Sequence, residues 1–488
     1  MTKQTSNGGR VGMLKLIAAS ALGAGLVTGV PLIAQVTTGQ KPAAVAPSTL
    51  TSTPAQPRVV PAAKSDAISS YAPIVRRSSA AVVNVYARSI QRGRVAVDFF
   101  GGAFRMPDRA SQSQGSGVVV RDDGIIVTNN HVVDGATELV VVLGDRREFP
   151  AKIVLTDPRT DLAVLRIDTK GERLTALRFA NTSNAQVGDQ VLAIGNPFGV
   201  GQTVTGGIIS ALARTDVGIT DYSFFIQTDA SINPGNSGGA LVDMNGDLVG
   251  VNTAIFSRSG TSAGVGFAIP AEMVKRVVDG AVTDGKVIRA WTGIKGQNVD
   301  AEVARSLGLS RPGGILVTDV YPGSAGAEAG LRRGDVITAF AGAPVADDSG
   351  LKYQAATRKP GESVEFTYQR QGQVRTSRGK LSAPPGEAQT PRVLAGRHSF
   401  DGVSIATINP ALAEEQGVDP FTRGAIVTAV DGAREGARAG LRPGDIILQI
   451  NNEPIQSSQD LAGRLSGGQR GKVTIQRGDQ QITAVLFL

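Results

Sequence analysis

A serine set among glycines, followed at once by an apolar segment, is the first candidate for chemistry in this chain. The stretch INPGNSGGALV, residues 232–242, places Ser237 among Gly235, Gly238 and Gly239. A tight turn of this composition presents a hydroxyl and bare backbone N–H groups to one point. Attack by a serine hydroxyl also needs a general base, and the base needs an acid that orients it. The turn therefore predicts a nucleophile, with a plain β-turn that does no chemistry as the alternative.

The base can be sought at only two positions, because the chain has two histidines. His131 lies in VTNNHVVDG, at the end of an apolar segment where a loop is expected to begin. His398 lies far along the chain, before the second of two repeats. A lone histidine is more often structural than catalytic, but if Ser237 uses an imidazole, the sequence favours His131.

The orienting acid is less well determined by the residues alone. Asp161 is favoured because it directly precedes the segment LAVLRI, whose expected strand would fix its side chain. Asp157 precedes a proline and is expected to cap a turn, and Asp229 is too near Ser237 in sequence to reach the far side of the imidazole. Other aspartates of the region stay open, namely Asp134 and Asp168.

The composition excludes several further classes of site and function. The chain of 488 residues has no cysteine, which excludes disulfides, thiol catalysis and cysteine-ligated zinc. Two histidines argue against a histidine-rich metal site, and no Gly-Lys-Ser/Thr follows the glycines around Ser237, which argues against a phosphate loop. We therefore expect no metal and no cofactor. The net charge is +8, but the basic residues are scattered, so nucleic-acid binding is not expected.

The N-terminus carries a targeting signal. Lys3, Arg10 and Lys15 precede the mostly apolar residues 16–36, which is typical of an export signal or a membrane anchor. We assign residues 1–36 to this signal or anchor, and its cleavage is left open. Residues 37–65 are rich in Pro and Ala and are interpreted as a linker. The rest of the chain is expected in the periplasm or its equivalent.

Residues 115–269 contain short apolar segments separated by turn residues about every ten positions. This spacing is typical of an antiparallel sandwich or barrel, and helical periodicity in residues 269–285 predicts a helix that closes the domain. A further helix is expected near residues 66–80. Residues 91–113 are interpreted as a long irregular insertion. Its phenylalanines either contact a partner or fold back on the body: Phe99, Phe100 and Phe104.

The last part of the chain repeats itself. The segment that begins GILVTDV at Gly314 recurs as GAIVTAV at Gly424, 110 positions later and without a gap. Two units of this length indicate duplicated domains rather than a solenoid. The expected domains are 66–285, 286–383 and 399–488, with a Pro-rich linker at 384–398.

Several motifs carry a family resemblance. TNNHVV, TDLAVLRI, GNPFG, GNSGGALV and GVGFAIP, in this order before a duplicated unit, resemble those of the HtrA/Deg (Do-like) serine proteases. The resemblance runs from about Ser65 to the C-terminus, and the two repeats resemble PDZ domains. It implies a mainly β protein, in which a chymotrypsin-like double β-barrel precedes two PDZ domains. It also implies an ATP-independent serine endopeptidase that degrades unfolded or damaged exported proteins.

The resemblance implies roles for single residues. It makes His131 the base, Asp161 the orienting acid and Ser237 the nucleophile of an acyl-enzyme mechanism. The oxyanion hole would be formed by Gly235, Asn236 and Ser237, with the N–H groups of the first and last as donors. The specificity pocket would be apolar and of low selectivity, lined by Ile232, Ile255 and Val265. Peptide C-termini would bind the PDZ units by strand addition at Gly313, Gly314, Ile315, Leu316, Arg423, Gly424, Ala425 and Ile426.

The expected partners are unfolded polypeptides and peptide C-termini. The resemblance also implies a homotrimer or a multiple of trimers, with residues 91–113 contacting other subunits. If residues 1–36 are retained as an anchor instead of being cleaved, the N-terminus would associate with the inner membrane. A resting state that stays inactive until a peptide binds a PDZ unit is a further hypothesis. The alternative function is a peptide-binding chaperone or scaffold with little proteolysis.

Overall fold

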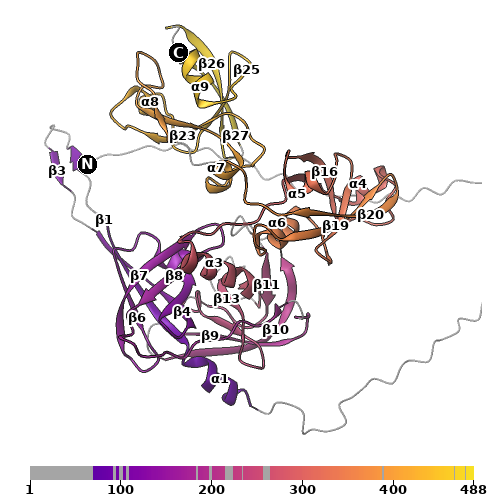
Figure 1. Ribbon diagram of the computed structural model, residues 1–488. Helices are drawn as coiled ribbons and strands as arrows, with labels where there is room; N and C mark the ends of the chain where they lie inside the picture. Colours follow the sequence, from indigo (N-terminus) through magenta and orange to yellow (C-terminus); the bar gives the residue numbers. More distant parts are fainter. Residues whose placement is uncertain are drawn as a thin grey trace, which may run out of the picture. The chain divides into compact units, whose positions relative to one another are not determined.

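Two closed antiparallel barrels form the first part of the folded chain (Figure 1). The computed structural model describes residues 70–91, 95–97, 103–105, 109–182, 185–196, 201–214, 224–233, 235–255, 264–386, 390–465, 468–478 and 480–488. The short helix α1 (Ala72–Ser79) precedes the first barrel. The strand order of the first barrel is β1-β4-β5-β8-β7-β6. The bounds are β1 (Val82–Gln91), β4 (Arg109–Arg121), β5 (Ile125–Asn129), β6 (Glu138–Val142), β7 (Glu148–Asp157) and β8 (Leu162–Ile167), with α2 (Asn130–Val133) between β5 and β6.

The second barrel has the order β10-β11-β14-β13-β12-β9. Its strands are β9 (Gln190–Gly195), β10 (Thr203–Arg214), β11 (Phe225–Thr228), β12 (Ala240–Val242), β13 (Leu248–Ile255) and β14 (Gly266–Pro270). Closure pairs every barrel strand on both sides, so neither barrel leaves a free edge. The expected double β-barrel is confirmed.

Aliphatic side chains fill both barrels. All five residues of β5 are buried, and Ile125, Ile126 and Val127 have no exposed surface. The helix α3 (Ala271–Thr283) follows the second barrel and buries Met273, Val274, Val277 and Val278. This spacing of three and four residues places them on one helical face, so the expected closing helix packs onto the barrels by an apolar stripe.

The expected irregular insertion contains regular structure, and that prediction needs correction. The strand β1 continues to Gln91, opposite Arg109 of β4, and β2 (Val95–Val97) pairs with β3 (Ala103–Arg105). The segment therefore continues the pairing of β1 with β4 and contains a separate two-stranded sheet. Phe99 and Phe100 lie outside the described residues, and Phe104 belongs to β3.

The first repeat forms a sheet in the order β15-β16-β17-β19-β20, with β18 paired to β17. The strands are β15 (Ile294–Asn298), β16 (Ile315–Val320), β17 (Val336–Phe340), β18 (Ala343–Pro344), β19 (Ser363–Arg370) and β20 (Gln373–Lys380). The helices are α4 (Ala301–Ser306), α5 (Ala325–Glu328) and α6 (Asp348–Ala356).

The second repeat has the same arrangement with one added strand, in the order β21-β22-β23-β24-β26-β27, with β25 paired to β24. The strands are β21 (Arg392–Val393), β22 (Val403–Thr407), β23 (Ala425–Val430), β24 (Ile446–Ile450), β25 (Glu453–Pro454), β26 (Arg470–Arg477) and β27 (Gln480–Phe487). The helices are α7 (Pro410–Glu415), α8 (Glu435–Arg438) and α9 (Ser458–Arg464). The two repeats are therefore duplicated domains, as expected.

The expected linker at 384–398 is too long. Arg392 and Val393 pair with Ile405 and Ser404 of β22, and Leu394 is buried in the core of the second repeat. A strand that satisfies its backbone groups in the sheet belongs to the domain, so the second PDZ-like domain begins before residue 399.

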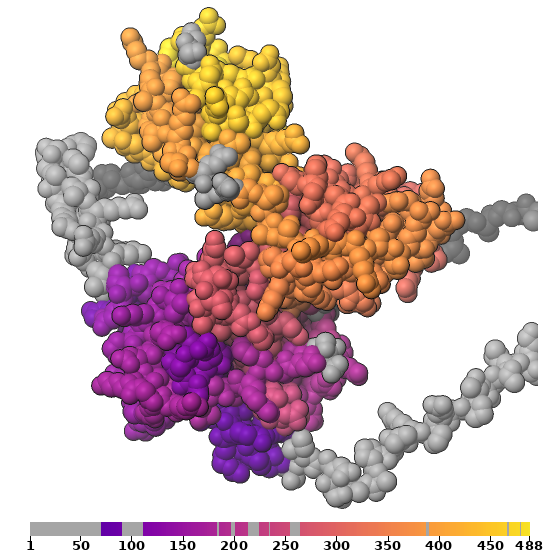
Figure 2. Space-filling model, in the orientation of Figure 1, coloured from indigo at the N-terminus to yellow at the C-terminus, as the bar shows by residue number. Residues whose placement is uncertain are grey.

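In Figure 2 the indigo to magenta surface belongs to the barrels and the orange to yellow surface to the repeats. Each repeat has an apolar core of its own, separate from that of the other repeat.

One ion pair recurs in both repeats. Arg370 binds both carboxylate oxygens of Asp335 at 2.7 Å. Arg477 binds Asp445 in the same way. Hydrogen bonding to these buried carboxylates raises the pKa of both guanidinium groups. The duplication therefore extends to side-chain contacts.

Candidate active site

His131 lies on α2, directly after the buried strand β5. Its ring Nδ1 is 2.8 Å from Oδ2 and 3.0 Å from Oδ1 of Asp161. This contact places the proton on Nδ1 and leaves Nε2 as the acceptor. The His131 side chain is 51% exposed and that of Asp161 is 12% exposed. One side of the imidazole is therefore held by a covered carboxylate, and the other side is open.

Asp161 sits in the turn between β7 and β8 with a φ of 56°, in the left-handed region. Its Oδ1 accepts the backbone N–H of His131 at 3.0 Å, and its Oδ2 accepts the hydroxyl of Thr253 at 2.6 Å. Its carbonyl oxygen accepts from Asn129 Nδ2 and from the N–H of Asn130, both at 3.0 Å. These contacts stabilise a backbone conformation that is unfavourable for a residue other than glycine.

The other aspartates of the region have different partners. Asp157 forms an ion pair with Arg289, Asp229 accepts the N–H of Ile208, and Asp168 accepts the N–H of Lys170. Asp134 is exposed. Of the five aspartates, the structure brings Asp161 to the imidazole.

Ser237 lies in the turn that precedes β12. Its Oγ donates to the carbonyl oxygen of Thr253 at 3.1 Å. Among the described residues, this hydroxyl makes no hydrogen bond to the His131 ring. Thr253 therefore joins the serine and the aspartate, because its carbonyl oxygen accepts from Ser237 and its hydroxyl donates to Asp161.

The backbone around Ser237 depends on glycine. Gly235 has a φ of 100° and Gly238 a φ of 83°. A Cβ atom at position 238 would lie 2.1 Å from the carbonyl oxygen of Ser116. Asn236 is buried, and its N–H donates to Asn233. Within the described chain, the N–H groups of Gly235 and Ser237 donate to no protein atom, so both can serve a ligand.

Sequence reasoning missed two residues of this site. Thr253 lies within β13, and Ser116 lies within β4. The hydroxyl of Ser116 donates to the carbonyl oxygen of Gly235 at 2.6 Å. Nothing in the spacing of either residue signalled a contact with the turn around Ser237.

The specificity pocket expected at Ile232, Ile255 and Val265 stays a prediction. Ile232 is 1% exposed and belongs to the core of the second barrel. Val265 is half-buried, and Ile255 ends β13 with its side chain outside the described part. Ile232 therefore acts as a core residue in this structure.

The expected carboxylate-binding segments of the repeats need correction. The N–H groups of Gly313 and Gly314 already donate to Val299 and Ala346. Ile315 and Leu316 lie on β16, which is paired with β15 on one side and with β17 on the other. A strand with both sides occupied cannot accept an added peptide strand.

The same correction applies to the second repeat. Ala425 and Ile426 on β23 pair with β22 and with β24. Gly424 is buried and its carbonyl oxygen accepts from Ile408, while Arg423 is exposed. This segment, too, is an inner part of its sheet.

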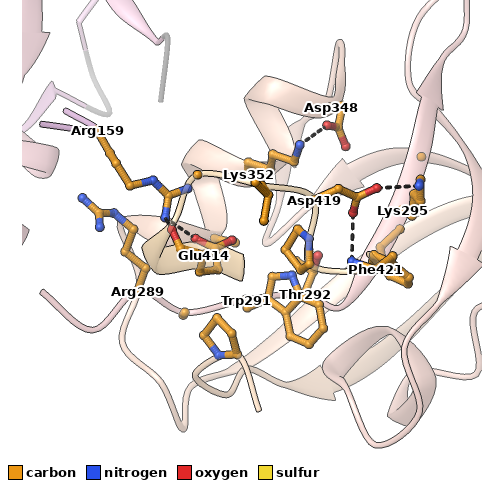
Figure 3. Close-up of a pocket in the computed structure, with 18 residues that line it drawn as sticks. Arg159, Arg289, Trp291, Thr292, Lys295, Asp348, Lys352, Glu414, Asp419 and Phe421 are labelled. Carbon is orange, nitrogen blue, oxygen red and sulfur yellow. Dashed lines mark hydrogen bonds and ion pairs between the residues drawn. The ribbon is translucent and has the colours of Figure 1, made fainter. Parts of the chain in front are cut away.

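A cavity of about 390 Å³ lies beside β15, which ends the sheet of the first repeat (Figure 3). Lys295 on β15 is paired with Asp419, and Lys352 on α6 is paired with Asp348 at 2.6 Å. The rings of Trp291 and Phe421 lie in contact, with centroids 6.2 Å apart. The cavity therefore combines cationic and aromatic groups next to a sheet edge, which are features of ligand sites.

In the described part of the chain, no group of three or more His, Asp or Glu side chains is close enough to hold a metal ion. No helix in the described ranges is long and apolar enough to cross a membrane. The apolar residues 16–36 lie outside those ranges.

Comparison with protein families agrees with the three folded units. Residues 115–251 match a model described as a trypsin-like peptidase domain. Residues 292–381 and 426–477 each match a model described as a PDZ domain.

Similar proteins extend over most of the chain. A probable periplasmic serine endoprotease DegP-like of Chlamydia trachomatis serovar D is 40% identical over 394 residues, which cover 78% of each chain. A protein of the same description from Rhizobium meliloti is 42% identical and covers 72% of this chain and 69% of its own. The solved structure of the HtrA-type protease AlgW with decapeptide is 42% identical, with a TM-score of 0.50, and covers 65% of this chain and all of its own. The chain belongs to the DegP-like, HtrA-type family of serine endoproteases.

Proposed function

We propose that Ser237 is the nucleophile of this serine endopeptidase, with His131 as its base and Asp161 as the acid that orients the base. The observation that carries the proposal is the series of contacts from the His131 ring to Asp161, from Asp161 to Thr253 and from Thr253 to Ser237. This series of contacts links the imidazole and the carboxylate of the first barrel to the serine hydroxyl of the second.

The chemistry follows from these positions. The Ser237 hydroxyl rotates from the Thr253 carbonyl toward Nε2 of His131, which removes its proton as the oxygen attacks the peptide carbonyl. The N–H groups of Gly235 and Ser237 hold the oxyanion. The imidazolium, stabilised by Asp161, then protonates the leaving amine. Water, activated by the same imidazole, releases the acyl group from Ser237.

The decisive experiment compares the wild-type chain with Ser237→Ala on unfolded casein and maps a fluorophosphonate adduct by mass spectrometry. We expect the wild type to cleave casein and to carry the adduct on Ser237, and the variant to do neither. Intact casein with the wild type under all conditions, together with an unlabelled serine, would favour a chaperone or scaffold.

The first PDZ domain is proposed to bind a peptide C-terminus along the outer edge of β15, with side chains entering the adjacent cavity. This edge has no strand beyond it in the described sheet, whereas β22 of the second domain already pairs with β21. The first domain should therefore bind more tightly. The peptide carboxylate would compete with Asp419 and Asp348 for the lysines beside them.

Fluorescence anisotropy with a labelled peptide tests this site. Lys352→Glu should weaken binding of the free-acid peptide about tenfold, which corresponds to about 1.4 kcal/mol. Lys275→Glu reverses a charge on α3, away from the cavity, and should leave binding unchanged. Equal affinity for the free acid and its amide would contradict carboxylate recognition.

Unfolded exported proteins are the proposed substrates, and the periplasm is the proposed compartment. The relatives described as periplasmic and the apolar residues 16–36 after a basic start support this location. A homotrimer, or a multiple of trimers, is proposed as the assembly. Sedimentation of the purified chain tests it, and a monomer at all concentrations would refute it.

A further inference from the structure

Ser116 belongs to the first barrel but holds the turn that carries Ser237 in the second. Its hydroxyl donates to the carbonyl oxygen of Gly235 at 2.6 Å, and its N–H donates to the carbonyl oxygen of Ser237 at 2.8 Å. One residue therefore holds the two carbonyl groups on either side of Asn236.

The rest of the turn is held as well. The N–H groups of Asn236, Gly238 and Gly239 donate to Asn233, Asn252 and Asn236, at distances of 2.8–3.0 Å. Of the N–H groups of residues 235–239, only those of Gly235 and Ser237 donate to no protein atom in the described chain. Because the neighbouring peptide groups are held by hydrogen bonds, these two N–H groups keep a fixed orientation and remain available to a ligand.

Ser116 is itself rigidly placed. It has no exposed surface. Its hydroxyl accepts the N–H of Asn196 at 2.9 Å, and its carbonyl oxygen accepts the hydroxyl of Thr128 at 2.7 Å. The same carbonyl oxygen lies where a Cβ of residue 238 would be, so the turn and β4 fit closely.

We propose that Ser116 is a positioning residue for the oxyanion hole. Its hydroxyl sets the plane of the peptide group between Gly235 and Asn236, and its backbone N–H sets the plane that follows Ser237. It acts through the turn and does not touch the substrate. The inference rests on the proposed role of Ser237.

The test is Ser116→Ala, assayed with a fluorogenic peptide and with a peptide boronate that forms a tetrahedral adduct on Ser237. We expect kcat to fall by about 10- to 100-fold, somewhat less than the loss of an oxyanion donor itself, and KM to stay within about twofold of the wild type because ground-state binding is retained. The inhibition constant of the boronate should rise with the fall in kcat. The pH profile of kcat/KM should keep its midpoint, because His131 and Asp161 are untouched.

Ser78→Ala is the matched control. Ser78 is equally buried in the same domain, and its hydroxyl donates at 3.4 Å to the carbonyl oxygen of Gly246, which lies outside the turn of residues 235–239. Thermal unfolding of both variants shows how much each loss affects the fold. An unchanged kcat in folded Ser116→Ala, or an equal loss in Ser78→Ala, would overturn the positioning role alone. A wild type that neither cleaves peptide nor takes fluorophosphonate would overturn the proposed function, and the positioning role with it.

Discussion

The hydroxyl of Ser237 donates to the carbonyl oxygen of Thr253 at 3.1 Å. In this conformation the proton of the proposed nucleophile points to a backbone oxygen instead of an imidazole nitrogen. The hydroxyl of the same threonine donates to Asp161 at 2.6 Å. Thr253 therefore influences both ends of the proposed triad, through its backbone at the serine and through its side chain at the acid.

Thr253→Val separates these two effects, because valine keeps the carbonyl and loses the hydroxyl. A hydrogen bond to a charged group contributes about 1.5–3 kcal/mol, so kcat/KM should fall by about 10- to 100-fold. Thr253→Ser retains the hydroxyl and should stay near the wild-type value. Steady-state kinetics on a peptide substrate measures both, and equal values for the valine and serine variants would refute a role of the hydroxyl.

Asp161→Asn tests the assignment of the acid. An amide at this position cannot stabilise the imidazolium and favours the wrong tautomer of His131, so kcat should fall by a factor on the order of 10⁴. Circular dichroism should show an unchanged fold. Activity within tenfold of the wild type would assign the orienting role to another group.

Much of the site was accessible from the sequence because chemistry limits residue types. The glycines around Ser237 predicted a special turn, and the scarcity of histidine pointed to His131. The alternation of apolar segments predicted a barrel or sandwich. Patterns within one segment were therefore sufficient to propose a nucleophile and a base and to predict the strands.

Contacts between segments were not accessible in this way. Thr253 and Asp161 are 92 positions apart, and Ser116 and Gly235 are 119 apart. Only the packing of the two barrels against each other brings them together. The expected peptide-binding segment at Ile315 was wrong for the same reason, because its sequence does not show that β16 becomes an inner strand.

The ion pair of Arg289 with Asp157 should stabilise the segment that leads to Asp161. Both side chains are nearly buried, at 10% and 7% exposed. Arg289→Ala leaves a buried carboxylate without this partner, so the free energy of unfolding should fall by about 3–5 kcal/mol. Urea unfolding of the purified chain measures this change.

Two variants control for this effect. Lys275→Ala removes an exposed ion pair with Asp279 and should lower the free energy of unfolding by less than about 1 kcal/mol. Replacing both members of the buried pair, Arg289→Met with Asp157→Leu, should recover much of the lost stability. A double variant no more stable than Arg289→Ala would show that the carboxylate alone does not explain the loss.

Tyr353 gives a prediction for alkaline pH. Its ring stacks on Phe224 with centroids 3.8 Å apart. Burial raises the pKa of the Tyr353 phenol well above 10.0, and the Glu272 carboxylate adds to the shift. The Tyr353 phenol ionises near pH 10 in the unfolded chain but stays neutral at that pH in the folded chain. The stabilising contribution is therefore complete below pH 10 and is lost as the pH rises from there toward the folded-state pKa.

Tyr353→Phe removes this ionisation and keeps the stacked ring. The unfolding midpoint of the variant should follow that of the wild type up to about pH 9 and should fall less steeply above pH 10. Thermal unfolding monitored between pH 7 and 11 measures the difference. Tyr71→Phe, at an exposed position before α1, should follow the wild type throughout. Parallel curves for Tyr353→Phe and the wild type above pH 10 would mean that the phenol is not held in its neutral form, because a buried neutral phenol must lose its stabilising effect once the unfolded chain ionises.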